Sequence, residues 1–271
     1  MKKILTTIGL LAASLAGANA AVLFTQDFAA GGTTSTYVSA SSPTTGQWNA
    51  ISTTGGAKAW SIASNTLQLS STGVNAGYAS RTTDFSSAPT VMQYSFSFNL
   101  VSSSTALTTA LDVEVGSGFS TNNSGETGAN VYAKFGINLT ASNGFVVRDI
   151  SGSANGATTF TGSQTITWIA NNSGLSTTYL APDGSTESLA NDTWDLWVGT
   201  SKQLNDRAAT TASQTITDFK FGTPTNTTAT YTAQFDNITI QDIPEPKTWA
   251  LLGIGSSFML WNLRRKRRLQ D

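Results

Sequence analysis

The sequence predicts an all-β protein: an antiparallel jelly-roll β-sandwich, flanked by an N-terminal signal-peptide helix and a C-terminal transmembrane helix. Between residues 21 and 242, short runs alternate apolar and polar side chains, and turns rich in Gly, Ser and Asn separate these runs. No helical period occurs between them, as it would if helices connected parallel strands. A stretch of about 220 residues with this pattern suits one large sandwich domain.

Residues 1–20 are expected to be a signal peptide. Lys2 and Lys3 precede a mainly apolar run over 4–15, and Ala18 and Ala20 occupy the small-residue positions before a cut after Ala20. A basic head, a short apolar segment and small residues at the cut are the three parts of a secretory signal. We therefore expect the mature chain to be exported and to begin at Ala21.

The strands of the 21–242 domain are predicted from alternation. The clearest run covers 92–100, where every even position is large and apolar and every odd position is polar, which indicates a half-buried strand. The other predicted strands cover 22–28, 66–70, 110–115, 131–139, 145–150, 165–170, 193–198, 216–221 and 231–240.

The last predicted strand changes phase within its length. Its apolar side chains occupy odd positions up to Phe235 and even positions from Ile238. One extra residue near Asp236 and Asn237 would return Ile238 to the core side, so we predict a β-bulge there.

Residues 243–271 are expected to form a membrane and sorting segment. Pro244 and Pro246 end the preceding strand, because each removes a backbone donor. Residues 248–263 carry no charge and would span roughly 24 Å as a helix, a short crossing that flanking cations can extend. A basic tail follows, made of Arg264, Arg265, Lys266, Arg267 and Arg268. The positive-inside rule then places this tail in the cytoplasm and the body on the other side.

The order Pro244-Glu245-Pro246, Trp249-Ala250-Leu251-Leu252-Gly253, short span and basic cluster resembles the PEP-CTERM sorting signal of exopolysaccharide-producing bacteria with Gram-negative envelopes. The resemblance covers about the last 29 residues; it departs from the family at Ile243, where Val is frequent, and at Trp249, where Tyr is common. It implies recognition by a membrane-embedded exosortase, removal of the tail, and delivery to the cell surface or extracellular matrix.

The composition excludes several classes of function. The chain has no Cys and no His, so disulfides, thiolate nucleophiles and the commonest metal ligand are absent from its sequence. We predict no catalytic residues, no cofactor, no metal site and no enzymatic activity. Residues 21–243 contain seven Lys and Arg against fourteen Asp and Glu, which argues against nucleic acid as a partner.

Asp112 and Glu114 are two residues apart on a predicted strand and should share one face. Two carboxylates at such spacing could act as the acid and base of a glycan-cleaving enzyme, but a solvated strand face is the simpler interpretation. The Glu-x-Asp-x-x-Glu pattern of jelly-roll glucanases is broken here, because Ala110 stands at its first position.

Five tryptophans belong to the body: Trp48, Trp60, Trp168, Trp194 and Trp197. Aromatic rings can hold sugar rings by stacking. Alternation along 193–198 places Trp194 inside and Trp197 outside, so Trp197 with Asp195 is the first candidate for a carbohydrate contact. A Trp that shields a sandwich edge is the alternative.

Asp27 and Asp236 could meet if the terminal strands pair, and their oxygens could then contact Ca²⁺. Two carboxylates are too few for a calcium site, which needs six to eight oxygens, so turn roles are favoured.

The segments 166–174, 194–198 and 235–240 (ITWIANNSG, WDLWV and FDNITI) are similar to concanavalin-A-like and laminin-G-like sandwiches. This similarity implies an architecture only.

Together these features predict an exported, exosortase-sorted, non-catalytic protein of the cell surface or of an exopolysaccharide or biofilm matrix. The expected partners are the secretion machinery, the exosortase, the inner membrane as a transient anchor, and extracellular polysaccharide. A carbohydrate-binding, lectin-like module is the alternative, and a glycan-cleaving enzyme is the weaker one.

Overall fold

The computed structural model describes residues 20–225 and 229–243. The predicted signal peptide, including Ala18, lies outside this part except for its last residue. The sorting motif Pro244-Glu245-Pro246, the membrane span and the basic tail also lie outside it. Within the described part, no helix has the length and apolar character needed to cross a membrane.

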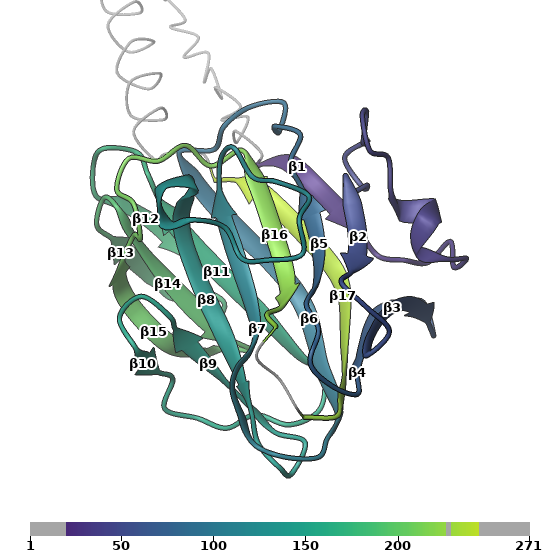
Figure 1. The fold of residues 1–271 in the computed structure, drawn as a ribbon. Coiled ribbons are helices and arrows are strands. Elements are labelled where there is room, and N and C mark those ends of the chain that lie inside the picture. The colour runs from purple at the N-terminus through teal and green to yellow at the C-terminus, as the bar shows by residue number, and fades with distance from the viewer. Residues whose placement is uncertain (1–19, 226–228, 244–271) are drawn as a thin grey trace, which may run out of the picture.

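The described chain forms two antiparallel β-sheets that face each other (Figure 1). The eight-stranded sheet has the order β15 (Ser201–Ala208), β14 (Thr193–Val198), β11 (Gln164–Asn171), β6 (Val91–Ser103), β17 (Tyr231–Asp242), β4 (Thr66–Ser71) and β3 (Lys58–Ala63), with β1 (Ala21–Gln26) also paired to β17. The seven-stranded sheet has the order β10 (Ala154–Asn155), β9 (Phe145–Asp149), β8 (Val131–Leu139), β7 (Leu107–Gly116), β16 (Asp218–Thr223), β5 (Gly77–Arg81) and β2 (Ala50–Thr53). A separate hairpin contains β12 (Thr177–Leu180) and β13 (Thr186–Leu189), and two short 3₁₀ turns are η1 (Thr34–Tyr37) and η2 (Gly128–Asn130).

The chain crosses repeatedly between the two sheets. Strands β1, β3, β4 and β6 belong to the eight-stranded sheet, whereas β2, β5 and β7 belong to the other. The all-β antiparallel sandwich is therefore confirmed, and the crossings are consistent with the predicted jelly roll.

The alternation that predicts the strands also builds the core. In β6 the even-numbered side chains from Met92 to Leu100 are buried and the odd-numbered ones are half-buried. Aromatic rings from the two sheets meet between them. The ring centroids of Trp168 and Phe135 are 5.0 Å apart and those of Phe24 and Phe219 are 4.8 Å apart, and both pairs pack edge to face. Such edge-to-face pairs add to the hydrophobic stabilisation.

The predicted bulge in the last strand is confirmed. The pairing of β17 with β6 shifts register between Asp236 and Thr239, and Asn237 has a φ of 50°. Phe235 and Ile238 both face the core, with exposed fractions of 2% and 1%. The bulge also marks the point where the other neighbour of β17 changes from β4 to β1.

Candidate functional site

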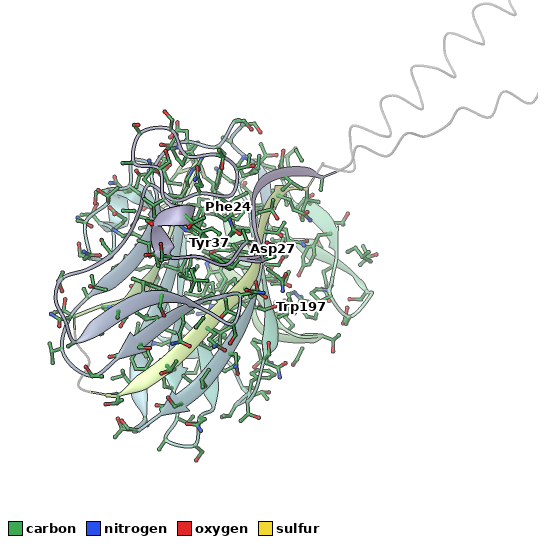
Figure 2. The ribbon with its side chains drawn as sticks, turned by 90° about the vertical axis from the view of Figure 1, so that its right-hand side faces the viewer. Phe24, Asp27, Tyr37 and Trp197 are labelled. Atoms are coloured by element: carbon green, nitrogen blue, oxygen red, sulfur yellow. The ribbon has the colours of Figure 1, made fainter. Side chains whose placement is uncertain are left out.

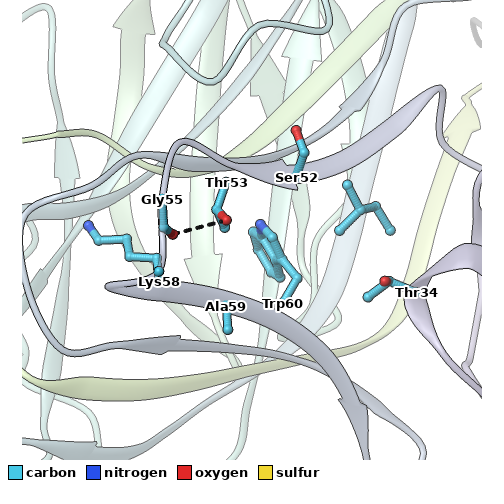
Figure 3. A pocket seen from close by; sticks show the side chains of 9 residues that line it. Thr34, Ser52, Thr53, Gly55, Lys58, Ala59 and Trp60 are labelled. Carbon is cyan, nitrogen blue, oxygen red and sulfur yellow. Dashed lines mark hydrogen bonds between the residues drawn. The ribbon is translucent and has the colours of Figure 1, made fainter.

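A hollow opens at the edge of the sandwich, where β2 and β3 end the two sheets (Figure 3). It has a volume of about 420 Å³. We call it the edge hollow; its lining residues are Thr34, Ile51, Ser52, Thr53, Gly55, Gly56, Lys58, Ala59 and Trp60.

Trp60 is the one aromatic residue of the edge hollow, and the core holds it rigidly. Its ring lies perpendicular to the ring of Phe221, with the centroids 5.9 Å apart, and is tilted against the ring of Phe235, with the centroids 6.1 Å apart. Because β3 is an edge strand, Trp60 is only half-buried. The edge hollow therefore has a fixed aromatic surface beside open space.

The polar groups around Trp60 are mostly neutral. Thr53 contributes a hydroxyl, and its Oγ1 donates to the carbonyl of Gly55 at 3.3 Å, whereas the neighbouring Ser52 donates its hydroxyl to Asn123 on the opposite face of β2. Lys58 is buried and donates to Thr223 Oγ1 at 2.8 Å; burial lowers the pKa of Lys58 to about 8. The indole N–H of Trp60 is buried without a hydrogen-bond partner among the described residues.

The prediction of an exposed Trp197 is wrong. Alternation correctly puts Trp194 in the main core and Trp197 on the opposite face of β14. Trp197, labelled in Figure 2, is nevertheless only 2% exposed, and Asp195 is completely buried. A sugar in solution cannot reach this pair in the present conformation.

The reason is the β12–β13 hairpin, which covers this face of the sheet. Trp197 packs there in a second apolar cluster with Tyr179 and Leu189 of the hairpin. Tyr179 donates its hydroxyl to Asp195 Oδ2 at 2.6 Å, and the indole N–H of Trp197 donates to the Tyr179 oxygen at 3.0 Å. The pair therefore fastens the hairpin, and the alternation of buried Thr177 and Tyr179 could have indicated that covering strand.

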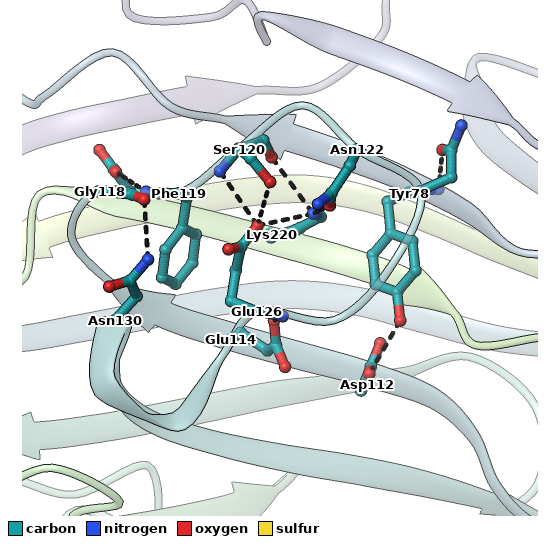
Figure 4. A network of polar contacts seen from close by, with 12 residues as sticks. Tyr78, Asp112, Glu114, Gly118, Phe119, Ser120, Asn122, Glu126, Asn130 and Lys220 are labelled. Carbon is teal, nitrogen blue, oxygen red and sulfur yellow. Dashed lines mark hydrogen bonds and ion pairs between the residues drawn. The ribbon is translucent and has the colours of Figure 1, made fainter.

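Asp112 and Glu114 share one face of β7, as predicted, but that face is not solvated. Both lie beneath the loop 117–130 on the outer side of the seven-stranded sheet, with exposed fractions of 7% and 1% (Figure 4). Glu126 from this loop and Lys220 from β16 lie with them. We call these four residues the covered cluster.

Hydrogen bonds connect the covered cluster to the neighbouring strand β5 and to the loop above it. Tyr78 donates to Asp112 Oδ2 at 3.0 Å, and the backbone N–H of Glu126 donates to Glu114 Oε2 at 2.8 Å. Gly125 of the loop lies very close to the carboxylates: a Cβ added to it would stand 3.1 Å from Glu114 Oε1. The loop backbone therefore packs directly against the carboxylates.

Burial sets the protonation of these carboxyls. Desolvation, reinforced by the charge of Glu114, raises the pKa of Asp112 to about 8, and desolvation also raises the pKa of Glu114. Asp112 Oδ1 has no hydrogen-bond partner among the described residues. A polysaccharide cannot reach either carboxyl under the loop, so the pair lacks the access that glycan cleavage needs.

The terminal strands β1 and β17 pair, but the carboxylates of Asp27 and Asp236 accept hydrogen bonds from backbone N–H groups close to them in the sequence, as in turns. Asp27, labelled in Figure 2, accepts from the N–H of Ala29 at 3.1 Å, and Asp236 accepts from the N–H of Asn237 at 2.8 Å. Among residues 20–225 and 229–243, no group of three or more acidic side chains is arranged to hold a metal ion.

A second hollow, of about 280 Å³, lies on the outer face of the eight-stranded sheet. A row of side-chain amides crosses three strands beside it: Asn99 donates to Gln234 at 3.2 Å, and Gln234 donates to Gln68 at 3.2 Å. We call this row, with the adjacent Ser97 and Asp236, the amide face.

No protein-family model matches the chain, and no curated protein matches it. Solved structures similar to it include a carbohydrate esterase from the Shiga toxin-encoding bacteriophage phi24B, with 13% identity, 83% of this chain and 100% of that chain covered, and a TM-score of 0.47. A second is a protein of unknown function with a galectin-like fold from Bacillus subtilis, with 8% identity, 71% and 89% covered, and a TM-score of 0.40. A third is domain 4 of an extracellular arabinanase from Geobacillus stearothermophilus, in complex with arabinotriose, with 11% identity, 82% and 93% covered, and a TM-score of 0.42.

Proposed function

We propose that residues 21–242 form a non-catalytic carbohydrate-binding domain, and that the edge hollow around Trp60 is its glycan site. The observation that carries this proposal is a rigid, partly exposed tryptophan beside a hollow of about 420 Å³. This volume lies within the usual range for small-ligand sites, roughly 300–1,000 Å³.

The chemistry of the edge hollow suits a sugar. The apolar face of a pyranose or furanose ring packs on an indole, while its hydroxyls need neutral donors and acceptors. Thr53 and the backbone at Gly55 and Gly56 supply such groups beside Trp60. The ring is held against the core before binding, so little conformational entropy is lost when a ligand packs on it.

The signals at the two ends of the chain deliver the domain to the place where its ligand is found. The signal peptide over 1–20 exports it, and the Pro244-Glu245-Pro246 segment with its span and basic tail presents it to an exosortase. The protein is then delivered to the cell surface or extracellular matrix, where exopolysaccharide is the available glycan. An acidic, sparsely charged body stays soluble in such a matrix without binding nucleic acid.

A binding assay tests the glycan site. The purified protein is applied to an array of bacterial and plant polysaccharides, and binding to the polysaccharides retained is quantified by the change in intrinsic tryptophan fluorescence of parent and variant. We expect Trp60→Ala to weaken binding by about tenfold or more, as truncation of a central aromatic contact does. Gln234→Ala on the amide face is the control and should bind like the parent. Unchanged binding by Trp60→Ala would move the site elsewhere, and a parent that binds no polysaccharide contradicts the proposed function.

Localisation tests the sorting proposal separately. Replacing Pro244, Glu245 and Pro246 by alanine should leave an uncut precursor in the inner membrane. If the variant has the same size and location as the parent, the sorting proposal fails while the glycan site stands.

A further inference from the structure

Lys220 occupies an unusual position at the centre of the covered cluster. It is completely buried, and its amine makes three short contacts with the loop above it (Figure 4). It donates to Asn122 Oδ1 at 2.8 Å, to Glu126 Oε1 at 2.8 Å and to the carbonyl of Ser120 at 3.2 Å. The amine nitrogen of Lys220 also lies over the ring of Tyr78, 5.0 Å from the ring centroid. A buried lysine amine thus contacts a buried carboxylate and the side-chain amide of Asn122, which lies at the exposed surface of the loop.

We propose that Lys220 and Asn122 react with each other to form an intramolecular isopeptide bond. Glu126 first takes a proton from the ammonium group across their contact. The neutral amine of Lys220 then attacks Cγ of Asn122, the new C–N bond forms, and the bond from Cγ to Nδ2 breaks. A second amine proton goes to the departing nitrogen, so ammonia leaves and Glu126 keeps its proton. The charges and atoms balance without an oxidant or cofactor.

The surroundings favour each part of this reaction. Removal of the ion pair between Lys220 and Glu126 is favourable in a buried site, because two charges in low dielectric are replaced by a neutral amide and a neutral acid. Glu126 touches the reacting amine and is the catalytic carboxyl. Asn122 itself lies on the exposed side of the loop, which gives ammonia a route out.

The loop is fastened on both sides of Asn122, so the reacting groups stay in contact. Before it, the N–H of Phe119 donates to Asp218 Oδ2 at 2.9 Å. After it, Asn123 Oδ1 accepts from Ser52 Oγ at 3.0 Å, and the N–H of Glu126 donates to Glu114 at 2.8 Å. Fixing two groups at such a distance raises their effective concentration by orders of magnitude over free groups.

The crosslink would have a structural purpose in this chain. It joins positions 98 residues apart and ties the covering loop to β16. The chain has no Cys, so no disulfide can perform this function. A covalent link of this kind resists reduction and restricts the unfolded chain in the same way as a disulfide.

Peptide mass spectrometry of the purified full chain tests the proposal. The folded protein is denatured and digested with trypsin, which cleaves after Lys and Arg. We expect one linked species, in which the peptide 82–134 is joined to the chain around an uncleaved Lys220, with a total mass lower by one ammonia. Free peptide 82–134 together with cleavage after Lys220 in most of the protein would overturn the proposal.

Four variants assign the bond to its atoms. Asn122→Ala, at an exposed position, and Lys220→Arg should both lose the linked species entirely, while Glu126→Gln should greatly slow its appearance. Lys134→Arg is the matched control, because Lys134 stands opposite Glu114 on the neighbouring strand β8 and takes no part in the proposed reaction, and it should keep the link. A linked species that persists in Asn122→Ala or Lys220→Arg, or that disappears in Lys134→Arg, contradicts the assignment.

Discussion

The outer faces of the two sheets follow the same alternating pattern but differ in what covers them. On the seven-stranded sheet the loop 117–130 closes over Asp112, Glu114 and Lys220, which are nearly or completely buried. On the eight-stranded sheet the β12–β13 hairpin covers Trp197 and Asp195, but the part of the face that carries Asn99 and Gln234 lies beside an open hollow, and both residues are half-buried. The covered face carries charges that must be paired, whereas the open face carries amides that water can also satisfy. A strand's outward residues therefore acquire their energetic importance from the loops above them.

The largest expected effect comes from Lys220→Met, which removes the cation of the covered cluster. Compared with a chain that keeps the ion pair, it leaves Glu126 unpaired under the loop, and breaking a buried pair in this way costs about 3–5 kcal/mol; Asn122→Ala, which cannot form the crosslink, is therefore the reference for this value. Urea unfolding of parent and variant gives the difference. Asn122→Ala, which removes the proposed crosslink but keeps the ion pair, separates the covalent share. A loss below about 1 kcal/mol, typical of exposed pairs, would mean that the cluster is open to water.

A change in pH dependence is expected from Asp112→Asn. The pKa of Asp112 is raised by burial from 3.8 to about 8, so between these values the folded state holds a proton that the unfolded state has released. The contribution of Asp112 to stability therefore falls as pH rises through this window, and it is fully present at the acid end. The variant should show a shallower fall, measured by urea midpoints at several pH values. Parallel profiles for parent and variant would show that Asp112 is accessible to solvent.

The smallest expected effect is that of Gln234→Ala on the amide face. Its two hydrogen bonds to Asn99 and Gln68 are replaced by water, so the free energy of unfolding should change by no more than about 0.5 kcal/mol. Thermal unfolding measures this directly. A loss of several kcal/mol would show that the amide row holds the strands together, and the contrast between the two faces would disappear.

Much of the fold could be predicted from the sequence, because alternation reports one buried and one outward face directly. The predicted strands 131–139 and 193–198 match β8 and β14, and the bulge at Asp236 and Asn237 is present. Strands β2, β3, β5, β10, β12, β13 and β15 were not predicted. The five residues of β5 are all buried, and the four residues of β2 are all half-buried, so neither strand shows the period of two.

The candidate site was harder to predict for the same reason. Alternation separates Trp194 from Trp197, but it cannot show that the β12–β13 hairpin covers Trp197. Trp60 looks like any inward residue of a strand, and it borders a hollow only because β2 and β3 are both edge strands. Contacts between distant segments, such as Lys220 with Asn122, leave no local pattern to read.

The sequence by itself determined the all-β class, the phase of the main strands, the bulge in the last one and the absence of cysteine and histidine chemistry. These properties depend on residue type and on neighbours along the chain. Only the tertiary structure decided which outward residues stay in water, which tryptophan borders a hollow, and which lysine meets a carboxylate and an amide. Burial depends on the segments that fold over a residue, and those segments lie far away in the sequence.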